Sequence, residues 1–185
     1  MKLDAYQLAT AVGAPLDRGY RWLDHINATL EAFCVNTPAR AAAFLAQVGH
    51  ESGGLRYARE IWGPTPAQQR YEGRVDLGNN VPGDGRRYMG RGLIQVTGRA
   101  NYRAAAAGLQ RWFPGAPDFE AQPDLLELPQ WAAASAGWYW ANRGLNELAD
   151  AGDFIGITRR INGGTNGLAD RQTRYAAARG VLGVA

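Results

Sequence analysis

Metal-binding and disulfide-forming residues are scarce in this sequence. Its 185 residues include one cysteine, Cys34, and two histidines, His25 and His50. One cysteine cannot form an internal disulfide, which fits a reducing compartment, and we expect Cys34 to be a small buried hydrophobic residue rather than a nucleophile. Zinc sites draw mainly on histidine and cysteine ligands, so the chain is poorly supplied for zinc. We expect neither a metal nor another cofactor.

Long apolar runs are also missing. No run approaches the roughly 20 residues that a membrane-spanning helix requires. The N-terminal segment carries Asp4 and has no apolar stretch of the kind found in signal peptides, so we expect a chain that is made and kept in the cytoplasm. Apolar residues make up 46% and charged residues 20% of the chain, as in ordinary globular proteins. A chain of 185 residues is long enough to bury a core as one domain.

Runs of like charge are the third missing feature. The net charge is +3 and the pI is near 9.2, and nearly all the basic residues are arginine. This balance weakly favours a polyanionic partner, either nucleic acid or an anionic cell-wall polymer, although a solvated basic surface is the simpler interpretation. A nucleic-acid-binding protein is disfavoured, because no basic run alternates with aromatic residues.

Helical patterns dominate what is present. At one helix both ends are marked: Thr37 suits the N-cap, Pro38 suits the first helical position, and Gly53–Gly54 supply a stop after Glu51 or Ser52. Amphipathic spacing predicts the other helices. They are expected at about residues 20–33, 100–109, 129–142, 144–151, 153–161 and 169–181.

The middle of the chain has a different composition. Residues 62–92 are rich in glycine, proline and asparagine and show no helical period, and so long a loop in a compact domain is usually functional or disordered. The run LIQVT at 93–97 is the only short segment with strand character, and residues 113–129, with four prolines, are expected to connect helices. The sequence therefore predicts a mainly α protein, with a glycine-rich central loop and at most a very small β element.

Several kinds of catalytic site can be excluded. The histidine and glutamate in GHES do not complete a zincin motif, because the position four residues after the histidine is Gly54. No G-x-S-x-G elbow is present, and Cys34 stands in no recognisable activating context. The GDG and GRG segments lack the strand, helix and lysine of a phosphate-binding loop. Carboxylates remain as the candidate catalytic groups.

Two glutamates nine positions apart are the strongest candidates. Glu51 shares a helix face with apolar residues such as Phe44 and lies in the last helical turn, and both features disfavour a negative charge. Glu60 follows a turn and is next to Arg59, which favours its ionised form. Glycoside hydrolysis requires an acid and a base with such different environments. The spacing alone also fits two ordinary surface charges, and His50 is expected to be a structural hydrogen-bonding residue.

The segments FLAQVGHES, ARE, YMGRGLIQVTGRANY, INGG and DRQTRY follow one another along the chain. In this order they resemble the signatures of glycoside hydrolase family 19, which contains chitinases and the endolysins of many bacteriophages. The resemblance covers about residues 38–175, and its Y-x-G-R-G-x-x-Q-x-T element is long and specific. It implies a lysozyme-like helical domain with a substrate cleft between two lobes.

The resemblance also implies roles for individual residues. Glu51 matches the family's general acid, Glu60 its general base, and Thr97 a hydroxyl that helps to hold the attacking water. The positions that match residues lining the sugar cleft, shaping it or supporting the glutamates are Gln95, Asn101, Asn162, Arg171, Tyr88 and Arg91. The implied reaction inverts the anomeric carbon, with the carboxyl groups about 6.5–9.5 Å apart to leave room for water. Trp62, in the loop near Glu60, is expected to stack on a sugar.

The chain differs from plant-type members of this family, which have a longer insert between the two glutamates and several cysteines. The short link and the single cysteine favour the endolysin-like branch, and hence peptidoglycan rather than chitin as the substrate. A chitinase and a non-catalytic sugar-binding module remain the alternatives. We expect one monomeric catalytic domain over residues 1–185, with an N-terminal helical segment at 1–35 and no separate wall-binding domain.

An endolysin of this kind is expected to accumulate in the host cytoplasm without a signal peptide. A separate holin-type protein would release it, and it would act on peptidoglycan glycan strands in the periplasm. Binding to nucleic acid and stable insertion into a membrane are not expected. Cleavage at either of the two alternating glycosidic bonds is consistent with these motifs.

Overall fold

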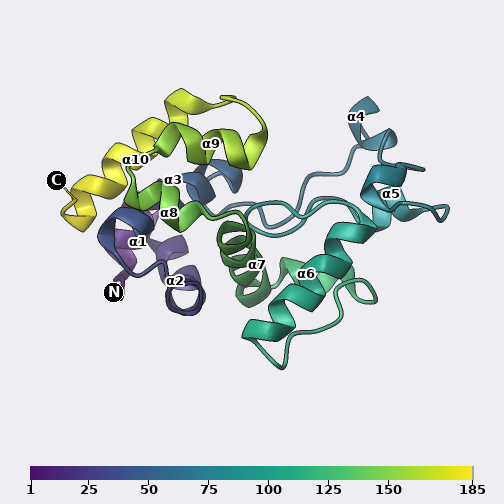
Figure 1. Ribbon diagram of the computed structural model, residues 1–185, viewed down its shortest axis with the longest axis horizontal. Helices are drawn as coiled ribbons and strands as arrows, with labels where there is room; N and C mark the ends of the chain where they lie inside the picture. The colour runs from purple at the N-terminus through teal and green to yellow at the C-terminus, as the bar shows by residue number, and fades with distance from the viewer. Residues whose placement is uncertain (185) are drawn as a thin grey trace. The chain divides into compact units, whose positions relative to one another are not determined.

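The computed structural model describes residues 1–184, which form helices joined by turns and loops (Figure 1). The chain divides into two compact units, one made of Met1–Tyr57 and Tyr139–Ala185 and the other of Ala58–Trp138. Taken together the described residues are mainly helical, so the expected fold class is confirmed. The expectation of a single catalytic domain stays a prediction. No helix within the described part of the chain is long and apolar enough to cross a membrane.

The first unit holds both ends of the described chain and most of the long helices (Figure 1). Its helices are α1 (Ala5–Val12), α2 (Leu16–Ala32), α3 (Pro38–Glu51), the end of α7 (Pro129–Asn142), α8 (Leu145–Asp150), α9 (Phe154–Asn162) and α10 (Leu168–Leu182). The long helices were expected from amphipathic spacing, and their observed bounds differ from the expected ones by a few residues at most.

Helix α3 is the centre of the first unit. It packs against α10 and α1, and every residue from Ala41 to Gly49 is buried. A helix that is apolar on all sides is expected to lie inside a core. Glycine permits the close approach of α1, because a Cβ at Gly49 would lie 2.7 Å from the carbonyl oxygen of Val12. The catalytic candidate Glu51 is therefore the last residue of the most deeply buried helix in this unit.

The ends of α3 follow directly from its sequence. The Thr37 side chain caps the first turn by accepting a hydrogen bond from the Arg40 N–H, and Pro38 occupies the first helical position. After Glu51 the chain turns through Gly53 and Gly54, which both have positive φ, 59° and 68°. Glycine adopts this conformation without a steric cost. The predicted start and stop of this helix are confirmed.

The second unit contains shorter helices and longer connections. It includes α4 (Pro66–Gln69), η1 (Val75–Leu77), α5 (Asp84–Arg87), α6 (Arg99–Trp112), η2 (Pro123–Glu127) and most of α7. Three of these short elements lie in the stretch 62–92, which was expected to lack helical structure. Each has only one turn, so a periodic pattern could not reveal it.

The expected strand at residues 93–97 is not formed. Residues 92–95 make a turn, and β-structure among residues 1–184 is limited to isolated antiparallel bridges joining Arg91 to Arg59 and to Val96. Leu93 and Ile94 are buried all the same. The apolar run therefore reflects burial in the core of the second unit and not pairing in a sheet.

Arginine–carboxylate pairs tie the connections of the second unit together. Arg99 at the start of α6 donates to both oxygens of the buried Asp84, at 2.6 and 2.9 Å, and lies 3.3 Å from Glu120. Arg103, one turn later, binds Glu120 through two nitrogens at 2.6 and 2.7 Å. Such two-nitrogen pairs fix geometry as well as supplying energy. They hold α5 and the segment before η2 against α6.

Replacing Asp84 by asparagine is expected to destabilise the second unit. The Arg99 guanidinium holds the pKa of the Asp84 carboxyl below its ordinary value, so the pair adds stability above the unfolded-state pKa of 3.8 and loses it as the pH falls through the lower folded-state pKa. Urea unfolding at pH 7 should show a loss of about 3 kcal/mol in Asp84→Asn. The loss should shrink towards pH 2. A matched change at the exposed Asp24 should have little effect, and a pH-independent loss at Asp84 would contradict the ion-pair explanation.

Cys34 is the residue whose placement differs most plainly from expectation. It was expected to be buried, but it is exposed and has a positive φ of 55°. It lies in the turn between α2 and α3. Connections between helices run over the surface, so its position in the turn outweighs the usual tendency of a free cysteine to be buried.

Candidate active site

The carboxyl group of Glu51 is held by one buried arginine. Glu51 ends α3, its side chain is 24% exposed, and its Oε1 accepts a hydrogen bond of 2.5 Å from Nη2 of Arg171. Arg171 lies in the first turns of α10 and is 3% exposed. No hydrogen bond to Oε2 is formed within residues 1–184. One oxygen of this carboxyl group is therefore fixed and the other is left available.

A chain of hydrogen bonds runs behind Arg171. Its Nη1 donates to Oε1 of the buried Gln47, and the Gln47 amide donates in turn to Thr158 at 2.9 Å. Gln47 precedes Glu51 by one helical turn, so both side chains reach the same guanidinium from α3. The sequence predicted an apolar face around Glu51; the structure adds a buried positive charge and its polar supports.

Replacing Arg171 by alanine is expected to lower both stability and activity. The change removes the partner of Glu51 and leaves the buried Gln47 oxygen without its donor, which should lower the free energy of unfolding by about 3 kcal/mol. Chemical denaturation of the variant measures this loss. Arg171→Lys should recover part of the stability. Lysine restores the positive charge, but it lacks the planar guanidinium group whose two nitrogens bind Gln47 and Glu51. The exposed Arg159 offers a matched alanine control in the same unit, and equal losses at the two positions would contradict the role of the network.

Two further residues of the first unit lie around this network. Asn162, the last residue of α9, donates to the carbonyl oxygen of Asn166 at 2.9 Å, and Nε of Arg171 donates to the same oxygen at 3.2 Å. The ring of His50 makes a 2.7 Å hydrogen bond with Asp170. The expected structural role of His50 is thus confirmed, while Asn162 supports the turn before α10 that positions Arg171.

Burial raises the pKa of the Tyr139 hydroxyl, and the carboxylate of Glu51 adds to this rise. The same hydroxyl donates to the carbonyl oxygen of Ile161 at 3.0 Å. Tyr139 was not singled out from the sequence, where it is one aromatic residue among several in α7. It therefore remains a neutral hydrogen-bond donor near the catalytic candidate.

The carboxyl group of Glu60 is held in a different way within the second unit. Its Oε1 accepts a hydrogen bond of 2.6 Å from the backbone N–H of Gly90, and its own N–H donates to the Gly90 carbonyl oxygen at 2.9 Å. Its Oε2 accepts a longer bond, 3.2 Å, from the side-chain amide of Gln68. Glu60 is partly exposed. Burial, together with the negative charge of Glu60, raises the pKa of the nearby Tyr71 hydroxyl.

Three predicted residues lie on the segment that follows Gly90. The exposed Gln95 places its side-chain amide over Gly90, where a Cβ would be 2.4 Å from the amide oxygen. Thr97 is partly exposed, and its hydroxyl makes no hydrogen bond within the described residues. Its carbonyl oxygen accepts a 2.7 Å bond from Asn101 in the first turn of α6. Residues 95–97 therefore present an amide and a hydroxyl that make no hydrogen bond within residues 1–184, on the unit that holds Glu60.

Tyr88 and Arg91 lie inside the second unit. Tyr88 is 1% exposed, its hydroxyl donates to the carbonyl oxygen of Glu120 at 3.0 Å, and its ring packs edge-on against Tyr102. Arg91 is 3% exposed and donates to two carboxylates and two neighbouring oxygens. Both residues therefore shape the Y-x-G-R-G segment from within, and Tyr88 is too buried to contact a ligand.

Trp62 is partly exposed in the loop after Glu60. Its ring centroid lies 6.3 Å from that of Tyr71, with the two ring planes tilted by 44°. A partly exposed aromatic face suits the apolar face of a sugar ring. Its stacking on a sugar remains a prediction.

Sequence reasoning missed the supporting residues Gln47, Gln68 and Gly90. Gln47 could have been found, because it stands four residues before Glu51 and so shares its helix face. Gln68 carried no signal, since it reaches Glu60 across a loop of no regular period. Gly90 was part of a quoted motif, but its bond to Glu60 depends on a fold that spacing does not reveal.

Each unit holds one anchored, partly exposed glutamate, and glycoside hydrolysis uses a pair of such carboxyl groups. Comparison with known proteins points to the same class. No family model matches the chain. A family 19 glycosyl hydrolase domain protein of Haemophilus influenzae is 35% identical over 180 residues, covering 82% of this chain and 84% of that protein. The chain belongs to glycosyl hydrolase family 19.

Further similarities give the same class. An Arabidopsis thaliana endochitinase is 39% identical over 124 residues, which are 66% of this chain but only 38% of that protein. The crystal structure of chitinase C from Streptomyces griseus superimposes with a TM-score of 0.73 and 26% identity, covering 97% of this chain and 76% of that one. This chain is therefore a chitinase-like glycoside hydrolase with the helical fold of that family.

Proposed function

We propose that this protein hydrolyses the β-1,4 glycan strands of bacterial peptidoglycan, as endolysins do, with inversion at the anomeric carbon. The observation that carries the proposal is the pair of partly exposed carboxyl groups with fixed partners. Glu51 is held by Arg171 at 2.5 Å and Glu60 by the Gly90 N–H at 2.6 Å. A non-catalytic sugar-binding module would have no need to hold either group in this way.

In the proposed reaction Glu51 donates a proton to the glycosidic oxygen and Glu60 takes a proton from the attacking water. Oε1 of Glu51 accepts from Arg171, so Oε2 is the oxygen that can carry the proton. The Thr97 hydroxyl can bind the water as donor and acceptor together. The chemistry requires the two carboxyl groups to flank one bond with room for water between them.

Peptidoglycan is favoured over chitin by charge. The chain has a net charge of +3, and peptidoglycan carries carboxylates on its peptide stems, whereas chitin is neutral. Attraction between a basic protein and a polyanion raises the rate of association and the local substrate concentration. The short link between Glu51 and Glu60 supports the same choice. Chitin is the second candidate, because the names of the Arabidopsis and Streptomyces relatives are those of chitinases.

Parallel digestion of purified sacculi and colloidal chitin tests the substrate. We expect new reducing ends from sacculi, with much slower release from chitin. Mass analysis of the fragments then identifies the sugar at the new reducing end and hence the bond that is cut. Rapid release from chitin with intact sacculi would replace peptidoglycan by chitin as the substrate.

A further inference from the structure

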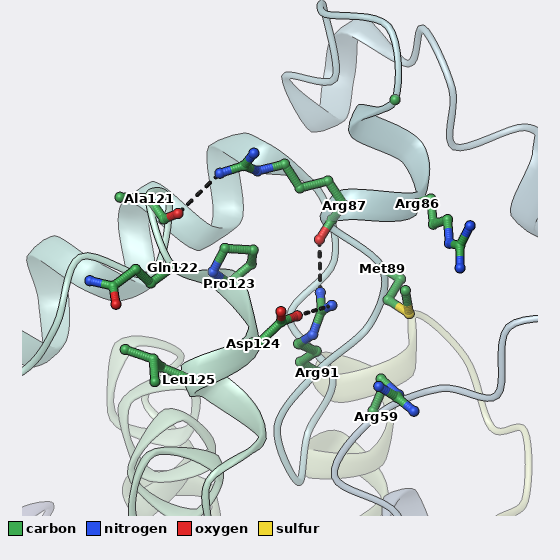
Figure 2. Close-up of a pocket in the computed structure, with 11 residues that line it drawn as sticks. Arg59, Arg86, Arg87, Met89, Arg91, Ala121, Gln122, Pro123, Asp124 and Leu125 are labelled. Atoms are coloured by element: carbon green, nitrogen blue, oxygen red, sulfur yellow. Dashed lines mark hydrogen bonds and ion pairs between the residues drawn. The ribbon is translucent and has the colours of Figure 1, made fainter.

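A cavity of about 790 Å³ in the second unit is lined by four arginines, Arg59, Arg86, Arg87 and Arg91 (Figure 2). Its volume lies in the range of small-molecule binding sites. The four side chains come from two segments, one just before Glu60 and one that begins in α5 and runs through Gly90. The second segment also supplies the Gly90 N–H that binds the Glu60 carboxyl group. We call the cavity the arginine pocket.

The positive charge of the arginine pocket is only partly balanced. Arg91 is neutralised, because its Nε lies 2.6 Å from Glu127 and its Nη2 lies 2.6 Å from Asp124. Glu127 also lies 3.4 Å from Arg59. These are the acidic groups paired with the pocket arginines among residues 1–184. Four guanidinium groups therefore face two carboxylates.

Arg86 and Arg87 supply the uncompensated charge. The Arg86 side chain makes no hydrogen bond or ion pair within the described residues. Arg87 donates through Nη2 to the carbonyl oxygen of Ala121 at 3.0 Å, which orients the group without neutralising it. Figure 2 shows the Arg87 side chain directed towards Ala121, whereas the Arg86 side chain lies away from Ala121 and near Met89. Two positive groups therefore remain available to an anionic ligand.

The elements that carry these arginines are fixed. Helix α5 begins at the buried Asp84, which Arg99 binds through two nitrogens. Arg59 is bridged through its backbone to Arg91, which is itself buried. A segment that is fixed in advance loses less entropy when it binds a ligand. The backbone that carries the four arginines is therefore held in place before a ligand binds.

We infer that the arginine pocket binds carboxylate groups of the peptidoglycan substrate, an inference that rests on the proposed function. Guanidinium groups bind carboxylates through parallel hydrogen bonds. Asp124 also lines the pocket, and its side chain is 83% exposed despite its contact with Arg91. The lining therefore offers a ligand a negative group as well as positive ones. A peptide stem, which carries carboxylates and an amino group, fits such a lining better than a polyphosphate does. Neutral chitin would not use the pocket.

The pocket binds a part of the polymer away from the bond that is cut. Successive side chains of an extended segment point to opposite sides, so Arg59 faces the pocket while Glu60 turns to Gly90 and Gln68. A stem that branches from the glycan can reach such a position. The expected signature is a change in substrate affinity with no change in the chemical step.

Removal of the two uncompensated charges tests this inference. In the double variant Arg86→Ala/Arg87→Ala, the KM for sacculi is expected to rise about ten- to hundredfold, which is the effect of losing charged hydrogen bonds to the substrate. The kcat should not change. Kinetics on a neutral chitin oligosaccharide should not change. Arg86→Lys should keep most of the affinity. The matched control is Arg111→Ala, an exposed arginine of α6 outside the pocket, for which no change is expected.

Two glycan substrates distinguish the sources of the carboxylate. An amidase that strips the peptide also frees the lactyl carboxylate, which is amide-bonded to the stem in sacculi. If the KM effect disappears on the stripped strands, only a stem carboxylate binds; if it persists, the freed lactyl carboxylate occupies the pocket as well. Either result supports the pocket. An unchanged KM for sacculi, or an equal rise for chitin oligosaccharide, would overturn it.

A binding measurement separates this inference from the proposed function. If the unaltered protein releases no reducing ends from sacculi, the proposed function fails, and isolated stem peptide is then titrated calorimetrically. Binding that is lost in the double variant would keep the pocket as a carboxylate site, and no binding by the unaltered protein would refute it.

Discussion

Glu51→Gln is expected to lower kcat on peptidoglycan by about 10²- to 10⁴-fold, the range for loss of a general acid. Glutamine has the shape of glutamate and keeps an oxygen that can accept from Arg171, but it has no acidic proton to transfer to the leaving oxygen. The fold should persist, since α3 is capped and buried independently of this side chain. Reducing-end assays measure the activity, and circular dichroism checks the fold.

Leaving-group dependence makes this test sharper. An aryl glycoside with an acidic phenol needs little protonation, so Glu51→Gln should affect it far less than it affects glycan strands. Glu31→Gln, at an exposed position of α2 in the same unit, is the matched control and should behave as the unaltered protein. An equal loss on both kinds of substrate would show that Glu51 is not the acid.

Glu60→Ala is expected to cause a loss of similar size, because the water then has no base. Azide needs no deprotonation and should restore part of the activity by attacking the anomeric carbon directly. The new bond joins azide to that carbon as the bond to the leaving oxygen breaks, and Glu51 supplies the proton. Inversion makes the product an α-glycosyl azide, which NMR identifies.

The acid variant is the control for this rescue. Azide should not restore Glu51→Gln on glycan strands, since the leaving oxygen still lacks its proton. Gln68→Ala should cause a smaller loss, because Gln68 contributes only the longer hydrogen bond to Glu60, 3.2 Å. A β-glycosyl azide from Glu60→Ala would assign Glu60 a role other than the base of an inverting enzyme.

Local signals in the sequence predicted the long helices well. Thr37 and Pro38 mark the start of α3, and the glycines after Glu51 mark its end, because capping depends on neighbouring residues. The run at 93–97 was misjudged for a physical reason. Apolar and β-branched residues favour strands, but they also occupy buried turns, and only tertiary contacts distinguish the two.

The sequence supplied candidate site residues, whose catalytic roles stay predictions, but it did not reveal the residues that support them. The two glutamates and Thr97 stand in motifs that resemble a known family, and the chain belongs to that family. Arg171 is 120 positions from Glu51, and the composition or period of either segment cannot reveal such a pairing. The arginine pocket arises in the same way, from residues about 30 positions apart in the sequence that the fold brings together.

The configuration of the first product tests the central claim most directly. Unaltered protein is incubated with β-1,4 glycan strands in an NMR tube, and the anomeric proton of the new reducing end is followed from the first minutes. If Glu51 and Glu60 act as acid and base on opposite faces of the sugar, the α-anomer appears first and the β-anomer grows in only through mutarotation. Initial formation of the β-anomer would contradict this mechanism.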